Sequence, residues 1–149
     1  MSVELREITS ETVRAVCSLE VAADQTGFVA PNAVSIAEAH FTPHHWMRAI
    51  YANGDPAGFL LTYEDPEEDS CWVWRFMVDA KHQHKGIGRQ AMRLLLERWR
   101  SLGVTAAALS VIPTNRETIA FYESLGFQLT GEEEGGEPVM RRQLEGSVG

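Results

Sequence analysis

The sequence predicts an α/β fold in which helices cover a mixed β-sheet. The strongest evidence lies in residues 71–100, where an apolar strand pattern is followed by a glycine-containing loop and then by a helix pattern. A second apolar run, bounded by Gly103 and Pro113, predicts a buried strand that is parallel to the first because a helical crossover joins them. Turn signals before and after this unit predict hairpins, so the other strands are expected to pair antiparallel.

The N-terminal part predicts one strand and two helices. Val3 to Ile8 begins with alternating apolar and polar side chains, as a half-buried strand does. Residues 9–12 offer a helix cap, and apolar residues at helical spacing continue from Val13 to Glu20. Residues 25–31 contain a glycine and a proline that break this helix, and a second helix is expected from Asn32 to about His40. We expect the two helices and the turn between them to form a mobile flap.

The middle of the chain predicts three strands. Trp46 to Ala52 and Ala57 to Tyr63 flank a strong hairpin signal at residues 53–56. In Trp72 to Val78, strict alternation places the even-numbered residues on one face and the odd-numbered residues on the other. Both faces are largely apolar, which predicts a strand in the middle of the sheet. Arg75 is the exception, and we expect it to form a structural ion pair rather than a ligand contact.

The C-terminal part alternates helices and strands. Gly103 and Gly126 each follow a helix pattern and are expected to end it. The final two strands are expected on either side of a turn rich in glutamate and glycine. The expected elements are a helix at 87–102, a strand at 104–111, a helix at 113–125 and strands at 127–130 and 139–144.

The loop at residues 83–89, Gln-His-Lys-Gly-Ile-Gly-Arg, predicts a binding site for an anion. Gly86 and Gly88 lack a Cβ, so consecutive N–H groups can turn towards one point and approach a bulky anion closely. The loop opens a helix, whose free N–H groups and dipole favour negative charge. Lys85 and Arg89 add positive charge, and the expected guest is a pyrophosphate. The loop matches neither the NTPase P-loop nor the complete G-x-G-x-x-G of dinucleotide folds.

Length and composition indicate one domain. The chain has 149 residues, 44% of them hydrophobic, which suffices for a single core. We expect this domain to span residues 1–145, followed by a frayed tail at 146–149. No apolar run approaches the roughly 18 residues of a membrane span, and the N-terminus lacks the pattern of a signal peptide. We therefore expect a cytoplasmic protein with no membrane partner. Cys17 and Cys71 are read as reduced apolar side chains, with a disulfide as the alternative.

The net charge of −8 argues against general nucleic-acid binding, which needs a basic face, and suits a cationic ligand. Acidic residues gather in two runs, at 64–69 and 132–137. Each run by itself is read as a solvated turn, and the alternative is that some of these carboxylates attract a polyamine. The histidines make no recognisable metal site, so no metal is expected.

A second motif follows the loop: Asn115 and Tyr122 are separated by six residues, and the string ESLGF comes next. Together with Gln-x-x-Gly-x-Gly at 83–88, this motif resembles the GNAT superfamily of N-acetyltransferases over nearly the whole chain. More narrowly, residues 75–79 and 126–140 are similar to bacterial spermine/spermidine acetyltransferases.

The resemblance implies a mixed, mostly antiparallel, twisted sheet of about seven strands flanked by about four helices. It implies acetyl-CoA as co-substrate, no metal and a homodimer. Tyr122 would lie near the cofactor sulfur and protonate the departing thiolate, although a place in the ordinary core is the alternative. Asn115 would hydrogen-bond the cofactor, and a helix cap is its alternative or additional role. The other residues implied to contact acetyl-CoA are Phe76, Met77, Val78, Gln83, His84, Lys85, Gly86, Ile87, Gly88 and Arg89.

The implied function is transfer of an acetyl group from acetyl-CoA to a primary amine of a polyamine or similar small amine, by direct attack in a ternary complex. Another acceptor, such as a protein N-terminus, an amino acid or an amine drug, is the first alternative, and a non-catalytic acyl-CoA sensor is the second. The flap would shape the acceptor pocket. The acidic residues of the flap are Glu20, Asp24 and Glu38. They are the first candidates for binding the amine and for acting as general base. His40 and Asp79 are the next candidates for the general base.

Overall fold

The computed structural model describes residues 1–22 and 31–144, and its centre is a seven-stranded sheet with the order β1-β2-β3-β4-β5-β7-β6. Neighbouring strands are antiparallel except β4 and β5, which are parallel. This arrangement confirms the predicted α/β class and the predicted mixed, mostly antiparallel sheet. The strands are β1 (Val3–Arg6), β2 (His45–Ala52), β3 (Asp55–Tyr63), β4 (Ser70–Val78), β5 (Ala106–Ser110), β6 (Gln128–Glu134) and β7 (Glu137–Gln143).

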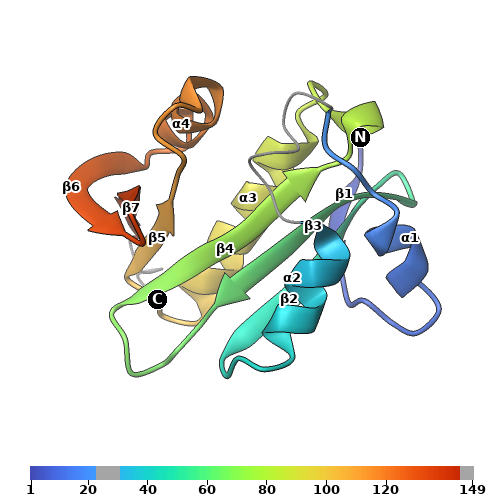
Figure 1. Ribbon diagram of the computed structural model, residues 1–149, viewed down its shortest axis with the longest axis horizontal. Coiled ribbons are helices and arrows are strands. Elements are labelled where there is room, and N and C mark those ends of the chain that lie inside the picture. The colour runs from blue at the N-terminus through green and yellow to red at the C-terminus, as the bar shows by residue number, and fades with distance from the viewer. Residues whose placement is uncertain (23–30, 145–149) are drawn as a thin grey trace.

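Helices cover both faces of the sheet (Figure 1). Trp99 of α3 and Tyr122 of α4 belong to the large core on one face, and Val16 of α1 and Ala39 of α2 belong to a smaller core on the other. The crossover from β4 through α3 to β5 is the parallel unit that the sequence predicts. The helices are α1 (Val13–Cys17), α2 (Asn32–Ala39), α3 (Ile87–Ser101) and α4 (Arg116–Ser124), with a short 3₁₀ turn η2 (Ala80–His82).

The predicted elements occur in the predicted order, but some ends differ. α1 ends at Cys17 rather than Glu20, and the Ser18 hydroxyl donates a hydrogen bond to the Arg14 carbonyl at that end. β6 and β7 are longer than predicted and meet at a two-glycine turn, so most of the second acidic run lies within a strand. The predicted break at 25–31 and tail at 146–149 lie mostly or wholly outside the described residues.

The predicted alternation along β4 is wrong at its middle. Leu61 of β3 pairs with Arg75, but the next residue of β3 pairs with Val73, so Trp74 is an extra residue in the ladder. Such a bulge shifts the phase of the strand. Val73 therefore lies on the α3 face, whereas Met77, predicted on the same face, packs against α1 and α2. Trp74 is 37% exposed rather than buried.

Glu64 is a structural residue and not part of a solvated turn, which corrects the interpretation of the first acidic run. Its Oε2 accepts a hydrogen bond of 2.7 Å from the indole N–H of Trp99, and its Oε1 accepts one of 2.7 Å from Arg98. Trp99 is fully buried in α3. The carboxylate thus ties the end of β3 to α3 and satisfies a buried donor.

A glycine in the left-handed backbone conformation lies at each end of α3. Gly86 is the N-cap residue with φ 81°, and Gly103 follows the helix with φ 78°. Residues with a Cβ adopt this conformation only at a cost, so glycine is suited to both positions. The helix therefore begins and ends within one residue of the predicted limits.

Two further expectations concern the cysteines and the membrane. Cys17 and Cys71 are both free, which confirms the interpretation as reduced side chains. None of the helices in the described part of the chain is both long and apolar enough to cross a membrane.

Candidate active site

β4 and β5 diverge towards one end of the sheet (Figure 1). Residues of both strands line a cleft there. The two strands pair from Ser70 opposite Ala106 to Val73 opposite Leu109. Beyond this point β4 continues to Val78 while β5 ends one residue later. The cleft has a volume of about 860 Å³, within the range of small-molecule sites. The part of β4 beyond Val73 therefore borders the cleft without a strand neighbour on that side, and an extended ligand can pair with its backbone.

The glycine loop forms one end of this cleft. His84 and Gly86 have positive φ values of 63° and 81°, so the backbone turns sharply before the first residue of α3. The amide of Gln83 donates a hydrogen bond of 2.9 Å to the carbonyl of Val78, which ties the loop to the end of β4. Free N–H groups at a helix N-terminus next to such a turn are suited to a phosphate group. The turn therefore lies at His84 and Gly86, whereas Gly88, predicted as part of the loop, lies within the first turn of α3.

Gly88 permits close packing beside the loop. A Cβ at this position would lie 3.4 Å from Phe76, 3.5 Å from Val78 and 3.6 Å from Phe121. The N-terminus of α3 therefore lies directly against β4 and α4. Arg89, one residue further, donates a hydrogen bond of 2.7 Å to Ser124 on α4, which holds its guanidinium beside the cleft.

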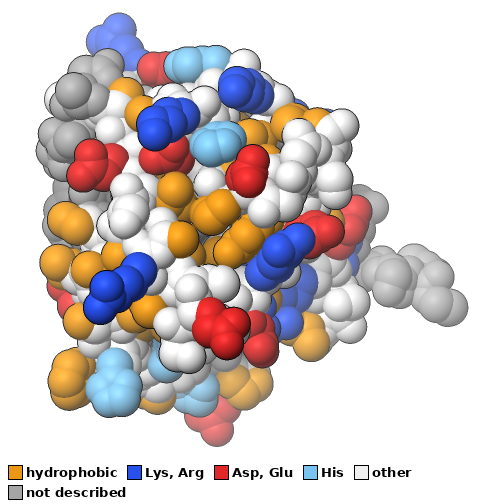
Figure 2. Space-filling view, turned by 90° about the vertical axis from the view of Figure 1, so that its right-hand side faces the viewer, with side chains coloured by type: hydrophobic (Ala, Val, Ile, Leu, Met, Phe, Trp, Pro, Cys, Tyr) orange, Lys and Arg blue, Asp and Glu red, His pale blue; other side chains and the backbone are white. Residues whose placement is uncertain are grey.

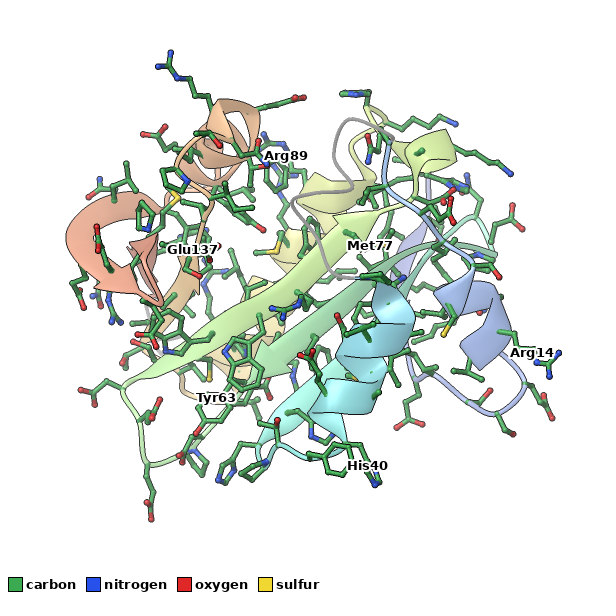
Figure 3. All side chains as sticks on the ribbon, in the orientation of Figure 1. Arg14, His40, Tyr63, Met77, Arg89 and Glu137 are labelled. Carbon is green, nitrogen blue, oxygen red and sulfur yellow. The ribbon has the colours of Figure 1, made fainter. Side chains whose placement is uncertain are left out.

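Figure 3 labels one residue from each of three sides of the cleft: Met77 on β4, Arg89 on α3 and Glu137 on β7. Every residue that the resemblance implies for acetyl-CoA lines this cleft except Lys85, which is exposed outside it. The implied residues that the fold brings together here are Phe76, Met77, Val78, Gln83, His84, Gly86, Ile87, Gly88, Arg89, Asn115 and Tyr122.

Asn115 caps the N-terminus of α4, which is the alternative or additional role predicted for it beside cofactor binding. Its side-chain oxygen accepts a hydrogen bond of 3.2 Å from the N–H of Thr118. The residue also lines the cleft. The cap and a ligand contact are therefore compatible at this position.

Tyr122 is 7% exposed, and its ring packs edge-on against Phe121 and Phe127. Burial raises the pKa of Tyr122 well above its usual value, so the hydroxyl stays protonated at neutral pH. Among the described residues, none hydrogen-bonds this hydroxyl, and the residue lines the cleft. Tyr122 therefore presents a proton donor to whatever the cleft contains.

Of the flap's candidate carboxylates that the structure describes, neither Glu20 nor Glu38 lines this cleft. Asp24 lies outside the described residues. Glu20 does not line the cleft, although its N–H donates to the buried carboxylate of Asp79 at 2.9 Å. Oδ2 of the same carboxylate lies 3.4 Å from Nδ1 of His82. The carboxylate of Asp79 therefore holds the chain after α1 against the end of β4.

Glu38 lies beside a second, smaller hollow of about 280 Å³ next to the cleft. Its carboxylate lies 3.8 Å from the guanidinium of Arg75, which is the ion pair predicted for that arginine. Trp74 and Arg75 line both cavities. His40, the remaining candidate base, is exposed and packs edge-on against Phe41.

Sequence reasoning missed the carboxylate that lines the cleft from β7. Glu137 is the first residue of β7, and its Oε1 accepts a hydrogen bond of 2.9 Å from the hydroxyl of Ser110. The acidic run that contains it was interpreted as a solvated turn, with attraction of a polyamine as the alternative, and Glu137 itself was not named as a site residue. Among the described residues, no three histidine, cysteine, aspartate or glutamate side chains gather in a way that could hold a metal ion.

Charges of both signs are mixed over the face of the molecule shown in Figure 2. Apolar side chains gather near the middle of this face, and Lys, Arg, Asp and Glu side chains are intermixed around them. The described residues on this face therefore form no continuous basic surface of the kind that nucleic-acid binding needs.

A family model described as the acetyltransferase (GNAT) family matches residues 8–127. The spermine/spermidine N(1)-acetyltransferase of Bacillus subtilis (strain 168) is 28% identical over 152 residues, covering 97% of this chain and 100% of the relative. The ribosomal protein bS18-alanine N-acetyltransferase of Escherichia coli (strain K12) is 35% identical over 75 residues, which is 50% of this chain and 49% of that protein.

Solved structures share the fold. The crystal structure of the PaiA N-acetyltransferase from Thermoplasma acidophilum in complex with coenzyme A has a TM-score of 0.74 to this chain at 16% identity. The match covers 96% of this chain and 99% of that structure.

Proposed function

The chain belongs to the acetyltransferase (GNAT) family, and we propose that it transfers an acetyl group from acetyl-CoA to a primary amine of a polyamine or similar small amine. The observation that carries this proposal is the cleft between β4 and β5, which residues of the glycine loop and Tyr122 both line. Acetyl-CoA supplies the activated acetyl thioester. Its diphosphate suits the loop, and its extended arm suits the free edge of β4.

The chain's own residues would contribute orientation and charge stabilisation. The backbone N–H of Met77 or Val78, in the part of β4 that has no strand neighbour on the β5 side, can stabilise an oxyanion at the thioester carbonyl. The hydroxyl of Tyr122 can donate a proton to the departing thiolate. The amine can attack the thioester directly, so orientation in a ternary complex suffices and no covalent enzyme intermediate is needed.

The attacking nitrogen must be neutral. An alkylamine has a pKa of about 10, so roughly one molecule in a thousand is nucleophilic at neutral pH. The enzyme must therefore bind the amine and allow one proton to leave for a base or for water.

Two observations support a polyamine as acceptor. The net charge of −8 favours the approach of a polycation, and a curated relative named for spermine and spermidine matches over 97% of this chain. A second candidate is a protein N-terminus, favoured by the 35% identity to an alanine N-acetyltransferase over half of the chain.

A panel of amines tests the proposal. The purified protein is incubated with acetyl-CoA and with spermidine, spermine, putrescine, lysine or a peptide with a free N-terminal alanine, and thiol release is followed. Fastest turnover with the polyamines is the expected result. Preference for the peptide would replace the polyamine by the second candidate, and acetyl-CoA binding without any turnover would indicate an acyl-CoA sensor.

A further inference from the structure

We propose that Glu137 binds a protonated nitrogen of the acceptor other than the nitrogen that attacks, so that the acceptor is a di- or polyamine. This inference rests on the proposed function and names a specificity-determining residue for it.

Glu137 is placed at the end of the cleft where the strands converge. Its hydrogen-bond partner Ser110 directly follows Leu109, which forms the last pair between β5 and β4. Gly86 and Arg89 lie at the N-terminus of α3, where the diphosphate is proposed to bind, and Figure 3 shows Glu137 across the gap from Met77. An acetyl group carried to the convergent end would therefore arrive near this carboxylate.

The Glu137 carboxylate is held in place with one oxygen available. Oε1 accepts the hydrogen bond from Ser110, whereas Oε2 has no hydrogen-bond partner among residues 1–22 and 31–144. Glu137 is half-buried and lines the cleft. A carboxylate with a fixed orientation and a free oxygen is suited to a charge-assisted hydrogen bond with an ammonium group.

The other described carboxylates near the cleft are less suited to this role. Glu38 is already paired with Arg75 and lines the neighbouring hollow instead. Glu117 also lines the cleft, but it lies in the first turn of α4, where the helix dipole favours its negative charge. Glu137 is the carboxylate that a hydrogen bond connects to the last residue of β5.

The chemistry of the attack identifies which nitrogen Glu137 can hold. The attacking nitrogen forms the C–N bond with its lone pair, the C–S bond breaks, and the thiolate takes up a proton while the new amide nitrogen loses one. A fixed anion stabilises a neighbouring cation, so it opposes loss of a proton from any nitrogen that it binds directly. Glu137 therefore suits a second nitrogen that stays protonated throughout.

Steady-state kinetics with putrescine and butylamine tests the inference, because the two amines have the same chain length and differ in the second nitrogen. Glu137→Gln should raise KM for putrescine about tenfold or more, as expected for loss of a charge-assisted hydrogen bond. KM for butylamine, kcat and the acetyl-CoA Kd should stay within about twofold of the wild-type values. Ser110→Ala should raise KM for putrescine less, because Ser110 only positions the carboxylate.

Two variants serve as controls. Glu133→Gln removes a charge from β6 of the same hairpin at an exposed side chain outside the cleft, and it should leave both KM values unchanged. Glu137→Asp keeps the charge and should recover part of the putrescine preference. Circular dichroism and melting temperature would establish that each variant is folded.

The outcomes separate this inference from the proposed function. Equal effects of Glu137→Gln on both amines, or no effect on putrescine, would overturn the role of Glu137 while leaving a working acetyltransferase. Wild-type protein that acetylates none of the amines in the panel would instead reject the proposed function, and the inference with it.

Discussion

Tyr122 can be tested as a general acid by removing one oxygen atom. Tyr122→Phe keeps the buried ring and its contacts but deletes the hydroxyl that lines the cleft. We expect kcat to fall by about 100-fold or more, because general acid catalysis contributes about that much, while the acetyl-CoA Kd changes little. Steady-state kinetics measures kcat, and isothermal titration calorimetry measures the acetyl-CoA Kd.

Tyr51→Phe is the matched control for this variant. Tyr51 is also 7% exposed, but it lies on β2 in the core against α1 and α2. Loss of its hydroxyl should leave kcat unchanged. A Tyr122→Phe enzyme that turns over as fast as the Tyr51→Phe enzyme would remove Tyr122 from the mechanism and leave it as a core residue.

Glu64 is expected to contribute to stability and not to catalysis. Glu64→Ala removes the acceptor of the Trp99 indole N–H, which is fully buried, and the partner of Arg98. A buried donor left without an acceptor costs about 1–3 kcal/mol, so the free energy of unfolding should fall by that amount. Urea denaturation measures it. The exposed neighbour Glu67 serves as control, and Glu67→Ala should change stability by less than about 0.5 kcal/mol.

At the scale of elements, the N-terminus of α3 combines a structural and a binding role. Gly86 and Gly103 flank the helix with φ values of 81° and 78°, and an added Cβ would contact nothing within 4 Å at either position. Valine at either position should therefore cost similar stability, about 1–2 kcal/mol, from backbone strain alone. Only Gly86 belongs to the cleft.

Gly86→Val should weaken acetyl-CoA binding by about tenfold or more, because the strained loop would no longer direct its N–H groups to one point. Gly103→Val should leave acetyl-CoA binding unchanged. Isothermal titration calorimetry of both variants gives the comparison. Equal Kd values for the two variants would show that the loop does not bind the diphosphate.

Local patterns were sufficient to predict the elements and the loop. The glycines that bound α3, the cap at Asn115 and the strand–loop–helix order all depend on neighbouring residues, so a sequence contains them directly. The parallel pairing of β4 and β5 follows from the length of the crossover between them. These features suffice to bring the implied acetyl-CoA residues, apart from Lys85, to one cleft.

Three features depend on distant partners and could not be predicted locally. The extra residue at Trp74 appears only when β4 is paired with β3, since the β4 pattern reads equally well as strict alternation. Glu64 meets a partner 35 residues away at Trp99, and Glu137 meets one 27 residues away at Ser110. An acidic run beside a turn has the same composition whether its carboxylates are solvated or paired.

At the scale of the whole molecule, the cleft is a consequence of the sheet's topology. The strands β1 to β4 form one part of the sheet and β5, β7 and β6 the other, and four residue pairs between β4 and β5 join them. The core against α3 includes buried side chains from both parts, such as Leu60 and Met140. The two parts thus diverge beyond these four pairs, where the cleft lies, while a shared apolar core against α3 holds them together.

Cys71 lies in this core, and its thiol makes stability depend on pH. Burial, and then the negative charge of Glu64, raise the pKa of Cys71 from 9.0 to about 11, partly opposed by Arg98. In the unfolded chain the thiol loses its proton near pH 9, whereas in the fold it keeps it until about pH 11. The folded state then binds more protons than the unfolded state, so stability is fully present below pH 9 and is lost as the pH rises towards 11.

Cys71→Ala isolates this contribution, because the other groups that titrate in this range are the same in both proteins. Urea denaturation at pH 8 and at about pH 10.5 should show a larger loss of unfolding free energy in the wild type than in the variant. Tyr122 also has a raised pKa in the fold, so it too lowers the unfolding free energy above about pH 10. Because Tyr122 is present in both proteins, the Cys71→Ala variant should still lose some unfolding free energy, but less than the wild type. An equal loss in the two proteins would mean that the Cys71 thiol titrates alike in the folded and unfolded chains.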